Sequence, residues 1–172
     1  NRITPVVSYV WRENGKTEGG PGEERALTSL YYSYDHRDYF DRIISQQFDR
    51  DGAYHTVGVE QRFNLWKAGK LWDGYYGDGR DAEDAKRWLQ LQIGYAYRNE
   101  RTQGDEFDLY GNSVRASAVV PLPYRLAFDF SGEFAWDQYT QPSRLDFRRN
   151  QRDDFTQRYG FGLSRILVGK GE

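Results

Sequence analysis

The chain of 172 residues contains no cysteine, so a disulfide framework and a thiolate metal site are excluded. It also contains no methionine and begins at Asn1, which predicts a processed or trimmed product rather than a primary translation product. The net charge is −2, and basic residues are interleaved with acidic ones throughout. This charge pattern gives no reason to expect nucleic-acid binding.

Long apolar runs are missing as well. No stretch approaches the roughly 18 to 20 apolar residues that a membrane-spanning helix needs, and charged residues make up 29% of the chain. A helical membrane protein is therefore excluded. A transmembrane β-barrel is not, because only alternate residues of its strands face lipid and the others can be polar.

Aromatic residues, in contrast, are abundant at 17%, with 14 Tyr and 5 Trp. Four motifs place two aromatic residues at period two directly before a polar cluster: Tyr9-Val-Trp11, Tyr32-Ser-Tyr34, Tyr95-Ala-Tyr97 and Phe134-Ala-Trp136. In a β-strand this spacing puts both rings on one face. The abrupt change to charged residues after the rings is typical of an aromatic girdle at a membrane interface.

Apolar and polar residues alternate along most of the chain, most clearly where Leu89, Leu91 and Ile93 oppose Gln90 and Gln92. This alternation predicts seven strands, near residues 3–13, 26–38, 53–66, 86–101, 108–121, 124–140 and 154–168. We therefore expect an all-β fold in a single domain spanning residues 1–172, which is either a whole barrel or part of one. The expected architecture is an antiparallel up-and-down transmembrane β-barrel, or a portion of a larger one, with long strands.

The connections predict an orientation. The segment 121–124 is too short for anything but a tight turn, and outer-membrane barrels keep such turns on the periplasmic side. The strand ends near Asp35, Arg98 and Asp137 should then meet at the opposite end. The first strand does not fit this scheme. Its motif at Tyr9 and Trp11 indicates that the strand runs toward the outer end, whereas strict alternation requires it to run toward the periplasmic end. Seven strands also conflict with the even number in single-chain bacterial barrels, so either one strand is hidden or the chain is part of a larger barrel.

The polar face of the predicted strands mixes charges of both signs. In a barrel these side chains would face the lumen, where charged rings set the field for passing solutes, whereas in a narrow barrel they would simply fill the interior. The predicted lumen-facing residues are Glu60, Arg62, Arg98, Arg115, Arg125, Asp129, Glu133 and Asp137. The predicted membrane-interface girdle consists of Tyr32, Tyr34, Tyr95, Tyr97, Phe134 and Trp136.

Residues with the potential for other chemistry are few. One loop gathers five carboxylates among glycines and is a weak Ca²⁺ candidate, formed by Asp73, Asp78, Asp81, Glu83 and Asp84. Its spacing does not match a twelve-residue calcium loop, so a solvated acidic loop is favoured. His36 and His55 could share a metal only if their strands are neighbours in register. No catalytic triad, phosphate loop or zinc spacing occurs, so we expect neither an enzyme nor a cofactor.

Five segments together resemble a known class of protein. They are residues 32–39 (YSYDHRDY), 51–58 (DGAYHTVG), 94–101 (GYAYRNER), 122–126 (LPYRL) and 162–165 (GLSR). They are similar to bacterial outer-membrane β-barrels of the porin-like kind, including those found behind tetratricopeptide repeats in surface-export proteins. The resemblance covers most of residues 26–167. It implies a location in the bacterial outer membrane, with the lipid bilayer, other envelope proteins or further barrel chains as partners.

Three functions are consistent with this pattern. The first is an outer-membrane barrel that forms a pore or passage with a mixed-charge polar lumen. The second is a non-conducting structural or anchoring barrel that presents its charged loops to a partner. The third is a soluble β-barrel that binds an apolar ligand in its interior. The third differs from the first two in that the side carrying Leu89, Leu91, Phe128 and Phe130 would face a packed core rather than lipid, and the first two differ in whether the barrel conducts.

Overall fold

The computed structural model describes residues 2–12, 24–38, 50–76, 85–104, 107–142 and 150–165. Two one-turn helices, α1 (Ala68–Leu71) and α2 (Asp73–Tyr76), follow β4, and no helix in these ranges is long and apolar enough to cross a membrane. The strands are β1 (Arg2–Ile3), β2 (Val6–Arg12), β3 (Glu24–Arg37), β4 (Gly52–Lys67), β5 (Trp88–Thr102), β6 (Leu109–Leu122), β7 (Leu126–Tyr139) and β8 (Asp153–Arg165).

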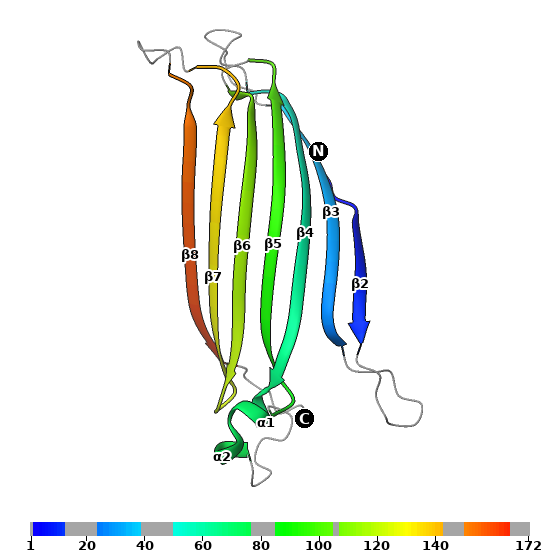
Figure 1. The fold of residues 1–172 in the computed structure, drawn as a ribbon, viewed down its shortest axis with the longest axis vertical. Helices are drawn as coiled ribbons and strands as arrows, with labels where there is room; N and C mark the ends of the chain where they lie inside the picture. Colours follow the sequence, from blue (N-terminus) through cyan, green and yellow to red (C-terminus); the bar gives the residue numbers. More distant parts are fainter. Residues whose placement is uncertain are drawn as a thin grey trace, which may run out of the picture.

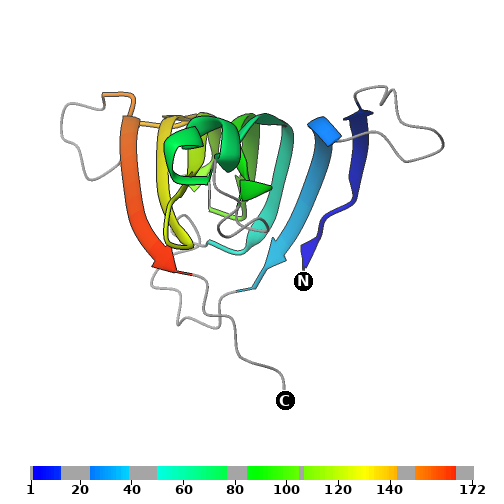
Figure 2. The same ribbon diagram turned by 90° about the horizontal axis from the view of Figure 1, so that it is seen from below.

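The strands form one antiparallel sheet in the order β1-β3-β4-β5-β6-β7-β8, with β2 paired to β3 on the same side as β1 (Figure 1). Every strand from β3 onwards pairs with the next one in sequence, which is an up-and-down meander. Seen from below, the sheet bends into a trough that stays open between β8 and β2 (Figure 2). The predicted all-β, antiparallel up-and-down architecture with long strands is confirmed, and the sheet of the described residues is not closed.

The seven predicted strands all exist, and the first is divided into β1 and β2 by Thr4 and Pro5. β2 pairs antiparallel with β3, so strict alternation includes the first strand. Trp11 pairs with Ala26 near the start of β3, whereas Tyr34 lies near the end of that strand. The first aromatic motif therefore lies at the opposite end of the sheet from the other three. Its direction was misread from sequence because such a motif marks either end of a strand equally well.

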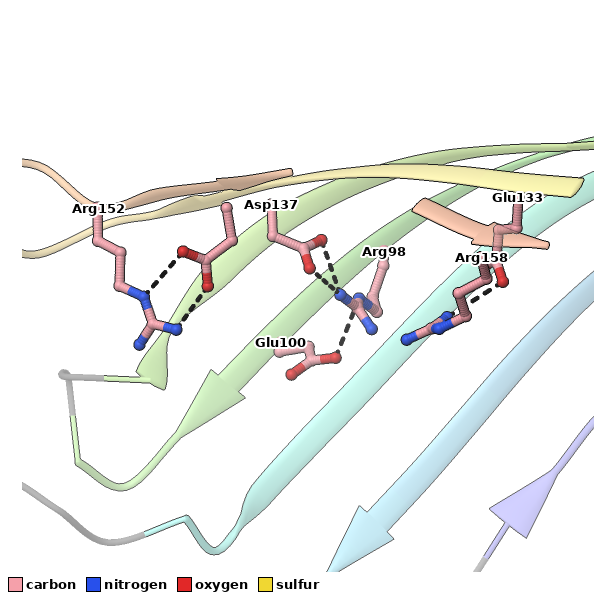
Figure 3. Close-up of polar contacts among 7 residues, drawn as sticks. Arg98, Glu100, Glu133, Asp137, Arg152 and Arg158 are labelled. Atoms are coloured by element: carbon pink, nitrogen blue, oxygen red, sulfur yellow. Dashed lines mark hydrogen bonds and ion pairs between the residues drawn. The ribbon is translucent and has the colours of Figure 1, made fainter. Parts of the chain in front are cut away.

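The two faces of the sheet differ sharply in chemistry. One register row joins Leu30, Val59, Tyr95, Val114 and Phe134 on successive strands, and the adjacent row joins Ser29, Glu60, Gly94, Arg115 and Glu133. Successive side chains of a strand point to opposite faces, so the two rows lie on opposite sides. The polar side is concave, because its side chains connect strands that are not neighbours, across the hollow of the trough (Figure 3). The apolar side is convex.

The connection after β4 covers the lower end of the sheet. The Ala68 backbone N–H donates to the Arg87 carbonyl at 2.7 Å, and the Trp72 indole N–H donates to the Pro121 carbonyl at 2.8 Å. The rings of Tyr75 and Tyr124 meet edge-on, with centroids 5.0 Å apart. This segment, expected to be a loop, thus holds two short helices tied to the β6–β7 turn.

The β6–β7 turn is tight, as predicted, but its backbone is unusual. Tyr124 and Arg125 have φ of 63° and 59°, and they are the two non-glycine residues with positive φ in the described chain. The Leu126 N–H donates to the Pro123 carbonyl at 3.4 Å, so Tyr124 and Arg125 are the two central residues of a β-turn. Arg125 was predicted to face the lumen from a strand. Its placement on a strand is wrong, because Arg125 lies in the turn before β7 begins.

Replacing Arg125 with glycine is expected to stabilise the protein relative to the Arg125→Ala variant by about 1 kcal/mol, because a side chain in the left-handed region costs about that much. Both variants lose the arginine side chain, so their difference isolates the backbone effect. Urea unfolding, followed by tryptophan fluorescence, measures it. Equal midpoints for the two variants would contradict the positive φ.

Candidate functional site on the concave face

The concave face carries a first row of ion pairs across the middle of the sheet. In register order the row consists of Glu60 on β4, Gly94 on β5, Arg115 on β6, Glu133 on β7 and Arg158 on β8. Arg115 donates to Glu60, and Arg158 donates to Glu133 at 3.1 Å. Acid and base therefore alternate along the row.

A second row lies closer to the upper end of the sheet. Arg98 on β5 donates through Nη2 to both carboxylate oxygens of Asp137 on β7, each at 2.7 Å (Figure 3). Its Nε lies 3.1 Å from Glu100 Oε1. Further along, Arg152 pairs with Asp154 at the start of β8. One guanidinium thus connects carboxylates from two different strands.

Glycines make the longer bridges possible. Arg115 and Glu60 are separated by β5, which places Gly94 between them, and Arg98 and Asp137 are separated by β6, which places Gly111 there. A Cβ atom at Gly111 would collide with the Asp137 carboxylate and lie 3.2 Å from Arg98 Nε. The absence of a side chain on the intervening strand therefore lets two strands that are not neighbours join across the hollow.

A cavity of about 240 Å³ lies between the two rows. Its floor is a register row of small residues that includes Ala96, Ser113 and Ala135. Tyr31 on β3 closes one side, and its ring covers Gly58 on β4. The hollow is therefore lined by charged side chains at its rims and by small side chains at its centre.

The charges that line this cavity balance. Three carboxylates, Glu60, Glu133 and Asp137, face three guanidiniums, those of Arg98, Arg115 and Arg158. The arginine side chains are 40%, 52% and 68% exposed, respectively. Ion pairs this accessible contribute about 0–1 kcal/mol each to stability. Their main effect is to hold the carboxylates and guanidiniums at defined positions along the hollow.

The structure brings together five of the predicted lumen-facing residues: Glu60, Arg98, Arg115, Glu133 and Asp137 all line the cavity. Arg62 is on the same face and pairs with Glu24 of β3. Asp129 lies on the concave side of β7, beside Val119 and Gly162. Arg125 is the exception and lies in the turn.

The predicted girdle residues lie on the convex face. The Tyr32 hydroxyl and His55 Nδ1 are 2.7 Å apart, and the Tyr95 hydroxyl donates to Asn112 at 2.6 Å. The ring of Trp136 stacks on Phe155 of β8 at 5.4 Å. Tyr34, Tyr97 and Phe134 also make ring contacts with residues of neighbouring strands. Tyr32 and Tyr95 thus combine an exposed ring with a hydrogen-bonded hydroxyl.

The metal candidates remain without support from the geometry. β3 and β4 are neighbours, but the register places His55 opposite Tyr34 and His36 opposite Ala53, so the two imidazoles are not opposite each other. Of the five acidic loop residues, Asp73 begins α2, and Asp78, Asp81, Glu83 and Asp84 lie outside the described residues. Within the described ranges, no group of three or more His, Asp or Glu residues could hold a metal ion.

Three residues of this candidate site were not identified from sequence. Arg158 lies opposite Glu133, Glu100 lies beside Arg98, and Tyr31 borders the cavity. The alternation of β5 and β8 contains the signal for the first two, since each shares a face with other polar residues. Tyr31 and Tyr32 are consecutive in β3, so their side chains lie on opposite faces. Because Tyr32 lies on the convex face, Tyr31 lies on the concave face.

Comparison with protein-family models, with curated proteins and with solved structures finds no match to this chain. What the fold and the site define is therefore a class of architecture: an open, all-β, up-and-down antiparallel sheet with a charged concave face and an aromatic convex face.

Proposed function

We propose that the chain is a bacterial outer-membrane β-barrel, or a portion of a larger one, that forms a pore or passage with a mixed-charge polar lumen. The observation that carries this proposal is the exposed apolar surface of the convex face. Val7 is 73% exposed, Leu163 65% and Phe161 84%. Soluble monomers rarely expose continuous apolar patches of more than a few hundred Å², so lipid is the natural solvent for this face.

The height of the convex face supports the same proposal. Its upper aromatic level includes Tyr32 and Tyr97, which pair with Val57 of β4, and its lower level includes Trp66 of the same strand. At about 3.3 Å per residue, Val57 and Trp66 are roughly 30 Å apart along the strand. A barrel tilt of about 40° reduces this to about 23 Å, close to the roughly 25 Å apolar band of outer-membrane barrels.

Closure of such a barrel requires further strands. β8 and β2 form the two edges of the described sheet, and both run in the same direction, because five alternating strands separate them. An edge exposed to lipid would leave backbone groups unsatisfied. Antiparallel closure therefore needs an odd number of additional strands. A second copy in the same orientation would place its β2 parallel to β8.

A non-conducting anchoring barrel is the second candidate, and the ion pairs across the hollow favour it. Bridges such as those of Arg115 with Glu60 and of Arg98 with Asp137 occupy space that a solute would use. Because both side chains of each pair are flexible and partly exposed, they line a passage in a wide barrel and fill the interior of a narrow one.

Single-channel recording in planar lipid bilayers distinguishes these functions. The proposal expects discrete conductance steps from the refolded protein when the strands that close the barrel are present, because the described sheet does not close by itself. A silent bilayer at all voltages would contradict the pore and leave the anchoring barrel. A chain that stays folded and monomeric without detergent would contradict both, and would favour the soluble ligand-binding barrel.

A further inference from the structure

One carboxylate on the concave face differs from all the others. Asp129 of β7 is exposed and has no hydrogen bond or ion pair in the described structure. The other charged side chains on the concave face of β4 to β8 each have an ion pair, a hydrogen bond or a ring contact: Glu60, Arg62, Lys67, Arg98, Glu100, Arg115, Glu133, Asp137, Asp154 and Arg158. Asp129 is thus the uncompensated charge of this surface.

The surroundings of Asp129 leave its charge open to the hollow. Its cross-strand neighbours on the same face are Val119 and Gly162, and the next row below the ion pairs contains Ser117, Ser131 and Gly160. None of these side chains carries charge or is long enough to cover a carboxylate. A Cβ atom at Gly162 would collide with the Asp129 carboxylate, so this glycine makes room for it.

The ion-pair rows above Asp129 cannot offset it. Glu133, the next charged residue along the same strand, is itself paired with Arg158. The cavity-lining charges sum to zero, and such paired charges produce fields that fall off quickly with distance. A single unpaired charge inside a low-dielectric wall has a longer reach, because the wall focuses its field into the aqueous hollow.

We propose that Asp129 gives the passage a preference for small cations over anions, an inference that rests on the proposed pore. The carboxylate attracts cations into the stretch of the lumen lined by Ser117, Ser131 and Gly160, and it repels anions of similar size. Charged side chains that line a pore are the usual determinants of such selectivity. The balanced rows contribute narrowing and little selectivity of their own.

The experiment measures the reversal potential of the conducting protein in a KCl gradient. The wild type is expected to pass K⁺ more readily than Cl⁻. The Asp129→Asn variant should lower the K⁺/Cl⁻ permeability ratio by about two-fold or more, and Asp129→Lys should bring it below one. These substitutions change charge at an exposed side chain without partners, so the fold should tolerate them.

Asp153→Asn is the matched control. Asp153 is the first residue of β8, and its side chain lies on the convex face. The variant loses the same charge outside the lumen, so its K⁺/Cl⁻ permeability ratio should equal that of the wild type. A conducting protein whose ratio is the same with Asp, Asn or Lys at position 129 would overturn this inference and leave the pore standing. A wild type without any conductance would overturn both.

Discussion

Lysine in place of Phe130 is expected to destabilise the protein in a phospholipid bilayer by about 2–4 kcal/mol, the cost of a basic side chain on the lipid face near the midplane. Phe130 lies near the middle of β7 on the convex face and is 46% exposed. Its neighbours in register are Ala118 and Phe161, both on the same face. None of them offers the ammonium group a partner.

Lysine at Ser131 is the matched control, because this next residue of β7 points into the concave face. There the ammonium group would meet water and the carboxylate of Asp129 two residues away, and its expected cost is below about 1 kcal/mol. Urea unfolding of both variants in lipid vesicles, followed by tryptophan fluorescence, gives the two differences.

The same pair of variants separates lipid from water as the solvent of the convex face. If this face met water, lysine at the half-exposed Phe130 would be tolerated about as well as at Ser131, since surface substitutions usually stay within about 0.5 kcal/mol. Equal stabilities in vesicles would therefore exclude the membrane-facing surface, and with it the proposed barrel.

The strands could be predicted from the sequence because period-two alternation directly reflects which side of a strand meets which environment. Leu89, Leu91 and Ile93 share a face in the structure as they do in the pattern. Neighbouring residues such as Phe130 and Ser131 alternate between apolar and polar. This alternation determines which residues of each strand lie on which face of the sheet. Ends and turns were less predictable, and Arg125 was assigned to a strand because it continues the alternation of β7 backwards into the turn.

The pairing of charges could not be predicted, because it depends on how far apart strands lie in the curved sheet. Arg115 and Glu60 are on strands that are not neighbours, and their contact needs both the curvature and the glycine between them. Alternation shows that both residues share a face, but it carries no information on curvature. The alternation also does not indicate that Asp129 has no partner, because pairing depends on the three-dimensional arrangement.

The helices α1 and α2 were missed for a different reason. Their segment, Ala68 to Tyr76, is short and rich in glycine and aromatic residues, so no helical periodicity can develop in it. The helical turns form because tertiary contacts hold them, including the hydrogen bond from Trp72 to Pro121. Local sequence gives little indication of structure that distant contacts impose.

Alanine in place of Gly58 is expected to destabilise the protein by about 1–3 kcal/mol, the usual cost of inserting a methyl group into a filled space. Tyr31 pairs with Gly58 across β3 and β4, and its ring lies where the Cβ atom of residue 58 would be. The ring is rigid and forms one wall of the cavity, so it cannot yield as the end of a flexible side chain would. Gly58 therefore leaves the space that the Tyr31 ring occupies.

A double-mutant cycle with Tyr31→Ala tests this packing. Once the ring is removed, the same Gly58→Ala change should become stabilising by about 0.5–1 kcal/mol, because alanine loses less conformational entropy in a strand than glycine. The sign of the effect thus depends on residue 31, which only a direct contact explains. Gly132→Ala is the control, since a Cβ atom there would lie 3.6 Å from the Tyr159 ring, an ordinary packing distance. If Gly58→Ala costs as much without the Tyr31 ring as with it, the ring does not rest on this glycine, and Tyr31 loses its place as a wall of the cavity.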